Sequence, residues 1–172
     1  MKKYVLVLMW MVFSMHLAHA QNQSVNGHQS GEEEAILQVI DDFMITLTTN
    51  DIAKRAGLQT EDGMTYTAVK RPDGSWRIVS RPNSVFLNPS PDDSPETVEK
   101  YWDPVVMIRG PLAMVWNPFE FLVDGKTSHC GVNLMQMVKT DGQWKLANTM
   151  WTHEPAETCN ALAPSHPDKV RP

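Results

Sequence analysis

The feature that most constrains the fold of this chain is a series of apolar segments between residues 103 and 154 that is interrupted by Asp-Gly pairs. The pairs stand at 124–125 and 141–142, and a Gly-Pro pair at 110–111 marks an earlier turn. An Asp-Gly pair between two apolar segments is typical of a tight β-hairpin, because a type I′ turn needs positive φ at both central residues. The spacing therefore predicts three or four consecutive antiparallel strands.

Two helices are predicted ahead of these strands. Ser30 is followed by acidic residues 32–34, which is the pattern of a helix start with a capping side chain and negative charge in the first turn. Asp51 is placed to cap a short second helix over 52–58. Apolar residues recur at helical spacing in the first helix: Ile36, Val39, Ile40, Phe43, Met44 and Leu47. This stripe predicts that the first helix lies against another element.

Between the second helix and the strands, the sequence predicts a hairpin, a loop and a third helix. Two β-prone segments within 63–80 flank an Arg-Pro-Asp-Gly turn. Residues 81–95 are rich in Pro, Asn and Ser and are expected to form a loop. Pro95 and Glu96 have the form of a helix start, and Pro104 is expected to end this helix at about Trp102.

The two ends of the chain have compositions unlike the rest. Residues 1–20 have a basic start, an apolar stretch and a small-x-small exit, which predicts a secretory signal peptide cleaved before Gln21. We therefore expect a periplasmic or secreted protein with no membrane association after cleavage. The polar leader 21–31 and the proline-rich tail 155–172 are expected to be disordered, which leaves a domain over 32–154.

Composition excludes some classes of function. The chain carries 20 acidic against 15 basic side chains, a net charge of −5, and has no basic run, which argues against nucleic-acid binding. It contains neither a C-x-x-C nor a His-x-x-x-His pattern, so no metal site and no cofactor are predicted. Cys130 and Cys159 could pair in an oxidising compartment, but geometry decides this and sequence leaves it open.

Segregated helices and a run of strands predict an α+β domain. The ending Asp141-Gly142-x-Trp144-Lys145-Leu146, followed by Trp151-Thr152, resembles the nuclear transport factor 2-like superfamily, which includes SnoaL-like, ketosteroid-isomerase-like and scytalone-dehydratase-like proteins. Residues 102–106, 113–116 and 128–131 are similar to a secreted bacterial group of unassigned activity. The resemblance covers 32–154. It implies a cone-shaped, curved antiparallel sheet around N-terminal helices, a pocket between them, and a homodimer, but no single chemistry.

Two-residue turns predict which side chains share a face of the sheet. Counting outward from them pairs Glu120 with His129, Trp116 with Asn133, and Met135 with Asn148 and Met114. The resemblance favours the face of Trp144 and Leu146 as the concave one. The expected pocket residues are the candidate catalytic pair His129 and Glu120, and the candidate ligand-binding residues Trp116, Asn133, Asn148, Met135 and Met150. A bulge near Pro118 would reverse part of this assignment.

Each candidate also has a structural interpretation. A histidine side chain ordinarily titrates near neutrality, which suits proton transfer, yet a histidine in a strand is more often a hydrogen-bonded structural residue, and His129 has both interpretations. Glu120 could orient His129 or lie exposed at a strand end, and Trp116 could stack on a ligand or belong to the core. Cys130 falls on the face opposite His129, which argues against a Cys-His nucleophile.

Three functions are compatible with this pocket. We favour a secreted domain that binds a small apolar or aromatic molecule. The alternatives are an acid–base enzyme (an isomerase, cyclase or dehydratase) that uses His129, and a protein-interaction module that uses the exposed sheet face.

Overall fold

The structure is a computed structural model that describes residues 31–88, 91 and 94–172. The chain divides into two compact units, 1–35 and 36–172, and the second unit contains all the strands of the described residues. The predicted signal peptide and residues 21–30 of the predicted leader lie outside the described residues.

Two helices precede the sheet, as predicted. The first spans residues 31–49 and ends where Asn50 takes a positive φ of 54°. The second, α2, spans Ile52–Leu58, and the side chain of its N-cap residue Asp51 accepts a hydrogen bond of 2.9 Å from the Lys54 backbone N–H. Asp51 therefore begins the second helix by satisfying one of its free backbone donors.

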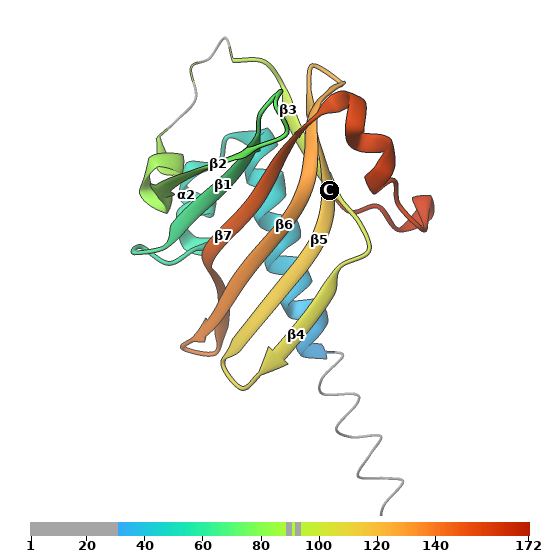
Figure 1. Ribbon diagram of the computed structural model, residues 1–172. Coiled ribbons are helices and arrows are strands. Elements are labelled where there is room, and N and C mark those ends of the chain that lie inside the picture. The colour runs from blue at the N-terminus through green and yellow to red at the C-terminus, as the bar shows by residue number, and fades with distance from the viewer. Residues whose placement is uncertain (1–30, 89–90, 92–93) are drawn as a thin grey trace, which may run out of the picture. The chain divides into compact units, whose positions relative to one another are not determined.

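One mixed sheet contains the seven strands found in the described part of the chain (Figure 1). Its order is β2-β1-β7-β6-β5-β3, and β4 pairs with β5. β1 runs parallel to β7, and every other pair is antiparallel. The strands are β1 Met64–Lys70, β2 Trp76–Pro82, β3 Thr97–Tyr101, β4 Val105–Arg109, β5 Leu112–Val123, β6 Lys126–Thr140 and β7 Gln143–Pro155.

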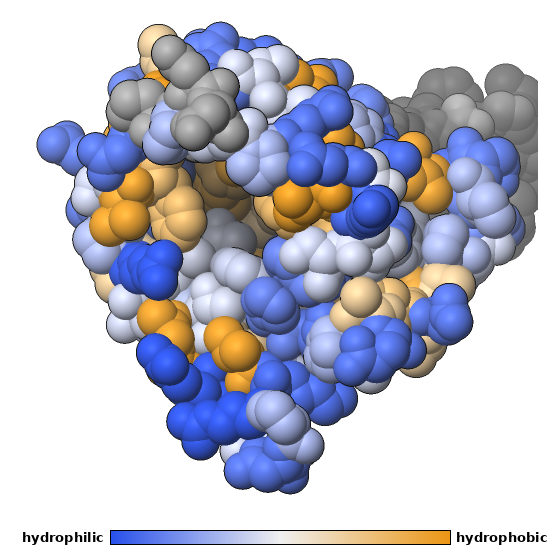
Figure 2. Space-filling view, turned by 90° about the horizontal axis from the view of Figure 1, so that it is seen from above, coloured by the Kyte–Doolittle hydropathy of each residue, from blue (hydrophilic) through white to orange (hydrophobic). Residues whose placement is uncertain are grey.

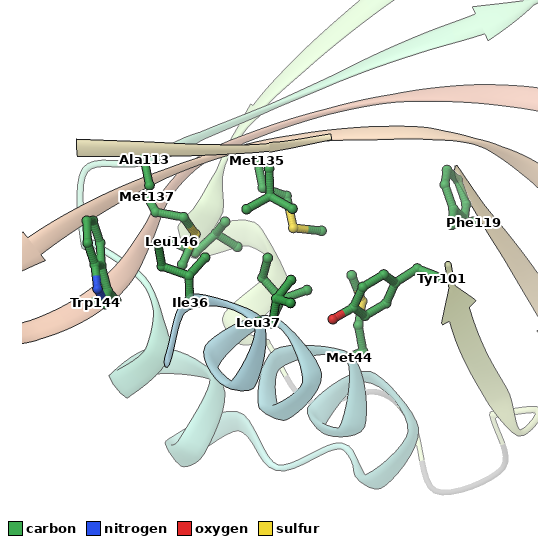
Figure 3. Close-up of a cluster of buried hydrophobic side chains, with 12 residues drawn as sticks. Ile36, Leu37, Met44, Tyr101, Ala113, Phe119, Met135, Met137, Trp144 and Leu146 are labelled. Carbon is green, nitrogen blue, oxygen red and sulfur yellow. The ribbon is translucent and has the colours of Figure 1, made fainter. Parts of the chain in front are cut away.

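The core lies between the first helix and one face of this curved sheet. In Figure 3, Ile36 and Leu37 of the helix point toward side chains of β6 and β7, among them Met137 and Leu146. The side chains that are at most 2% exposed in this cluster are Ile36, Ile40, Met44, Tyr101, Val115, Phe119, Met135, Met137 and Leu146. The apolar stripe of the helix is thus buried against the sheet, and the α+β prediction is confirmed.

Both Asp-Gly hairpins are confirmed. φ is 49° and 73° at Asp124 and Gly125, and 52° and 78° at Asp141 and Gly142, so each turn has positive φ at both central residues. The pairing of Val123 with Lys126 next to the first turn is also as predicted.

The prediction of a third helix over 96–102 is wrong, because Thr97–Tyr101 form strand β3. β3 pairs antiparallel with β5, from Thr97 opposite Val123 to Tyr101 opposite Phe119. A helix this short has little stability of its own, whereas the strand completes an edge of the sheet and buries Tyr101 fully. Tertiary pairing therefore overrides the local helix-start signal of Pro95 and Glu96.

The tail after Pro155 is ordered, so the prediction of disorder there is wrong. It forms the 3-10 helices η2, Ala156–Leu162, and η3, Pro167–Lys169. Cys159 is bonded to Cys130 of β6, which answers the pairing question that the sequence left open. Arg171 pairs with the backbone of Tyr101 through two hydrogen bonds of 2.8 and 3.2 Å. Its guanidinium also lies 2.6 Å from a carboxylate oxygen of Asp41.

The predicted faces are wrong for β5 and for the second half of β7, because two irregularities shift the register. Between Phe121 and Leu122 the β5–β6 pairing slips, so that His129 lies opposite Phe121 and Asn133 opposite Asn117. A second slip between Gln136 and Met137 affects β6–β7, and Met135 lies opposite Thr149. A one-residue slip exchanges the two faces of a strand. Trp116, Glu120, Asn148 and Met150 therefore lie on the face opposite His129, Asn133 and Met135.

Candidate functional site

The first helix, α2, the 3-10 helix η1 (Asn83–Leu87) and the inner face of the sheet enclose a cavity of about 300 Å³. Seen from above in Figure 2, the surface is hollowed, with hydrophobic side chains around the hollow. The lining is mainly apolar and aromatic: Phe43, Met44, Leu47, Phe86, Phe119, Phe121, Met135 and Trp151. The polar members of the lining are Arg55, Thr65, Thr97, Glu99, His129, Asn133 and Thr149. Such a mixture is typical of a pocket for a small organic ligand.

Glu99 of β3 and Asn133 of β6 form a polar pair in the wall. Asn133 Nδ2 donates a hydrogen bond of 2.8 Å to Glu99 Oε1 and lies 3.3 Å from Asn117 Oδ1. Loss of hydration raises the pKa of Glu99 to about 7, and the hydrogen bond from Asn133 works in the opposite direction. Near neutral pH this carboxyl group can therefore both donate and accept a proton.

His129 lies within an aromatic stack on the same face. Its ring stacks with His153 and Phe121 at centroid distances of 4.0 and 4.9 Å, and Nδ1 lies 3.2 Å from Ser128 Oγ. Burial is the main cause that lowers the pKa of His129 to about 4, and the electrostatic effect of neighbouring His153 contributes to the same shift. His129 is consequently a neutral imidazole at neutral pH and can act as a proton acceptor.

Arg55 of α2 brings a positive charge to the cavity wall while only 6% of its surface is exposed. Its Nε donates to Thr46 Oγ1 at 3.1 Å, one terminal nitrogen donates to the Phe86 carbonyl at 2.8 Å, and the other donates to the Thr46 carbonyl. These acceptors are all neutral. Burial lowers the pKa of Arg55 from its usual value.

The structure brings together three of the seven predicted site residues: His129, Asn133 and Met135 line the cavity. The expected pair of Glu120 with His129 is wrong, since the Glu120 carboxylate accepts a hydrogen bond from the Thr127 hydroxyl instead.

The other three predicted residues lie on the outer face of the sheet, which is the face opposite the cavity. Trp116 and Met150 line a shallow outer groove, and Asn148 donates to the Gln136 side chain at 2.9 Å. Their expected place in the pocket is wrong because the two register slips reverse the faces.

Sequence reasoning missed Glu99 and Arg55. For Glu99 a signal exists in the segment Thr97–Tyr101. Threonine, valine and tyrosine favour strands, and in a strand Thr97, Glu99 and Tyr101 share one face because every second residue does. For Arg55 there is none, since an arginine in a short polar helix is usually exposed. Only the packing of α2 against Thr46 and Phe86 identifies it.

Neither a membrane-spanning helix nor a metal-binding cluster occurs in the described part of the chain. No helix within it is long and apolar enough to cross a membrane. Among the same residues, no group of three or more His, Cys, Asp or Glu side chains is placed to hold a metal ion.

The sequence matches no protein-family model and no curated protein. Solved structures do match. A protein of unknown function from Mycobacterium tuberculosis superposes with a TM-score of 0.61 and 17% identity over 80% of each chain. A proposed scytalone dehydratase from Novosphingobium aromaticivorans superposes with a TM-score of 0.58 and 18% identity, over 73% of this chain and 86% of that one.

A nuclear transport factor 2-like superfamily protein from Salmonella enterica gives a TM-score of 0.56 and 15% identity, over 73% of this chain and 93% of that one. Another similar structure is described as having a cystatin-like fold. At such identities the likeness concerns the fold, and it agrees with the resemblance seen in the sequence. This chain has the nuclear transport factor 2-like, or cystatin-like, α+β fold.

Proposed function

We propose that the cavity binds a small, largely apolar molecule that contains a ring and a hydrogen-bonding oxygen. The observation that carries this proposal is the cavity of about 300 Å³ with an aromatic lining and one enclosed Glu-Asn pair. Phe119, Phe121 and Trp151 offer ring faces and edges to a flat ligand. Glu99 in its protonated form donates a hydrogen bond to a ligand oxygen, so the polar end of the ligand has a fixed position.

The neutral probe 2-naphthamide tests this proposal, with binding measured by isothermal titration calorimetry. We expect saturable binding to the wild type and at least about tenfold weaker binding to Thr149→Phe, since Thr149 lines the cavity and the larger ring fills it. Trp116→Ala is the matched control, because Trp116 is 42% exposed on the outer face. Absence of binding to the folded wild type would refute the proposal. Binding that depends on Trp116 and not on Thr149 would move the site to the outer face.

A second candidate function is acid–base catalysis, and the opposite pKa shifts of two cavity residues favour it. The pKa of Glu99 is raised to about 7, so this group can supply a proton at neutral pH. The pKa of His129 is lowered to about 4, so this group is free to take one. Two titratable groups whose environments shift their pKa values in opposite directions are suited to paired acid and base roles. The scytalone-dehydratase-like neighbour makes this chemistry relevant to the fold.

Exchange of the α-protons of 2-tetralone in deuterated water, followed by proton NMR, tests the catalytic candidate. We expect the wild type to accelerate exchange over buffer, and His129→Phe and Glu99→Gln each to reduce that acceleration by at least about tenfold. Glu120→Gln is the control, because its carboxylate is hydrogen-bonded to Thr127 on the other face. Equal rates in the wild type and both cavity variants would argue against catalysis and leave ligand binding in place.

Export to an oxidising compartment remains a prediction that the Cys130–Cys159 disulfide supports, because such bonds persist mainly outside the cytosol. N-terminal sequencing of the protein recovered from its source would test cleavage before Gln21.

The homodimer also remains a prediction. The outer face supports it with exposed apolar side chains, including Ile78, Met107, Leu112 and Trp116, and sedimentation velocity would test it.

A further inference from the structure

Arg55 is a buried cation in the wall of an apolar cavity. Only 6% of its surface is exposed, and the residues beside it in the cavity wall include Leu47, Thr65 and Phe86. Taking a guanidinium out of water is costly unless its charge is compensated by an anion. The observed acceptors, Thr46 Oγ1 and the carbonyls of Thr46 and Phe86, carry no charge.

The hydrogen bonds of Arg55 leave capacity for a ligand. A guanidinium has five N–H donors, and three are used by Thr46 and Phe86. One N–H on each terminal nitrogen has no acceptor among the residues that the structure describes. Two donors from one rigid, planar group match the two oxygens of a carboxylate.

No carboxylate of the described chain forms an ion pair with Arg55. Asp51 acts on it electrostatically, but Asp51 is exposed and its side chain accepts from the Lys54 backbone N–H. Water therefore screens this charge. Glu99 lines the same cavity from β3, and its side chain is bonded to Asn133. Among the residues that the structure describes, none therefore supplies an anion in contact with Arg55, and its two remaining N–H groups are available to an anionic ligand.

We propose that the ligand of this cavity is an organic acid whose carboxylate binds the two remaining N–H groups of Arg55 while its apolar body lies among the aromatic side chains. The proposal rests on the proposed binding function and names the chemical class of the ligand. It explains why an arginine occupies this place, since a neutral residue could also donate to the carbonyls of Thr46 and Phe86 without burying a charge. Glu99 and Asn133 then form hydrogen bonds with a second polar atom of the same ligand.

A matched pair of probes separates this proposal from ligand binding in general. The anion 2-naphthoate and the neutral 2-naphthamide have nearly the same shape, so the ratio of their dissociation constants at pH 7.5 reports the charge preference. We expect the wild type to bind 2-naphthoate at least about tenfold more tightly than 2-naphthamide. Because this comparison uses the unaltered protein, it does not depend on the folding of any variant.

Two variants then assign the preference to Arg55. Arg55→Gln should abolish or reverse the ratio, and Arg55→Lys should retain a preference for the anion but a smaller one, because an ammonium cannot form the planar two-point contact. Lys54→Gln is the control, since Lys54 is the neighbouring cation and is paired with Asp42 on the surface. It should leave the ratio unchanged.

Each outcome decides a different statement. Equal affinities, or tighter binding of the amide, would overturn the organic-acid proposal and leave the binding function intact. A preference for the anion that persists in Arg55→Gln would overturn the role of Arg55. Failure of both probes to bind the folded wild type would overturn the binding function and this proposal with it.

Discussion

Asn133 Nδ2 lies 2.8 Å from Glu99 Oε1, and this contact opposes the effect of enclosure on the Glu99 carboxyl group. A hydrogen bond that a carboxylate accepts favours its charged form, so the pKa of about 7 is already reduced by Asn133. The geometry links two residues that are 34 positions apart in the chain.

Asn133→Leu should raise the pKa of Glu99 above about 7, because enclosure then acts without the opposing donor. Carbon-13 NMR titration of the glutamate carboxyl resonances measures this directly. Asn148→Leu is the control, since Asn148 bonds to Gln136 on the other face. An unchanged pKa in Asn133→Leu would mean that the contact does not act on the carboxylate.

Glu99→Gln should change how stability depends on pH. The folded-state pKa of about 7 lies above the ordinary value of 4.5, so the folded state holds its proton more tightly than the unfolded chain. The resulting stabilisation is present below pH 4.5 and is lost as pH rises to about 7. Urea unfolding should show the wild type losing up to about 3 kcal/mol relative to Glu99→Gln across this range. A difference in unfolding free energy between the wild type and Glu99→Gln that does not change with pH would contradict the raised pKa of Glu99.

His129→Phe should produce the opposite change. The folded-state pKa of about 4 lies below the ordinary 6.5, so protons bind the unfolded chain more readily. The stability due to neutral His129 is present above pH 6.5 and is lost as pH falls to about 4. Relative to this variant, the wild type should lose up to about 3 kcal/mol on acidification.

The slopes due to Glu99 and His129 oppose one another between pH 4.5 and 6.5. The wild-type curve should therefore be flatter in this range than the curve of either variant. A wild-type curve as steep in this range as that of either variant would contradict the two opposed shifts.

Gly131→Ala should be severely destabilising. A Cβ atom at Gly131 would lie 2.0 Å from the Thr152 carbonyl oxygen and 2.5 Å from its hydroxyl, and the Thr152 hydroxyl accepts the Val132 N–H at 2.9 Å. Relief of this overlap requires β6 and β7 to separate. We expect a loss of about 2 kcal/mol or more in the free energy of unfolding.

Gly57→Ala is the matched control for Gly131→Ala. Gly57 lies within α2 with nothing within 4 Å of the position of a Cβ, so alanine should stabilise the protein by roughly 0.5–1 kcal/mol. Equal effects of the two substitutions in urea unfolding would show that the close approach at Gly131 is relaxed at little cost.

Loss of the disulfide should destabilise the protein, because the bond attaches the tail after Pro155 to strand β6. Cys130 and Cys159 are 29 positions apart, and a closed loop of that length corresponds to about 3–4 kcal/mol in the chain-entropy treatment. The Cys130→Ser/Cys159→Ser variant should unfold at lower urea concentration. Faster amide exchange should appear in 156–169, with strands β5 and β6 still protected. Exchange in the tail equal to that of the wild type would show that Arg171 and Asp41 hold it without the bond.

The local parts of the fold could be predicted from sequence, because turn chemistry and capping act over a few residues. The Asp-Gly turns, α2 with its cap at Asp51, and the apolar stripe of the first helix all belong to this class. The three correctly placed cavity residues, His129, Asn133 and Met135, lie on β6, whose alternation is unbroken between them.

The remaining parts depend on contacts between distant residues. The slip at Phe121 and Leu122 follows from how β6 meets β5 beyond the turn, and no residue near it signals a bulge. The order of the tail depends on a covalent bond and on the Arg171–Asp41 ion pair across 130 positions. The charge of Arg55 gains its significance only from the cavity beside it.

The position of β7 constrains the order in which this chain can fold. β1 pairs with β7 as well as with its hairpin partner β2, and Met64 N–H reaches the Asn148 side chain across 84 positions. On a ribosome, the first hairpin is therefore complete long before the strand that will hold it emerges. Until β7 emerges, the edge of β1 that β7 will cover stays unpaired, and this edge can pair with other chains. Pairings this distant carry a large loop-closure cost, so we expect slow folding in which docking of β7 comes last.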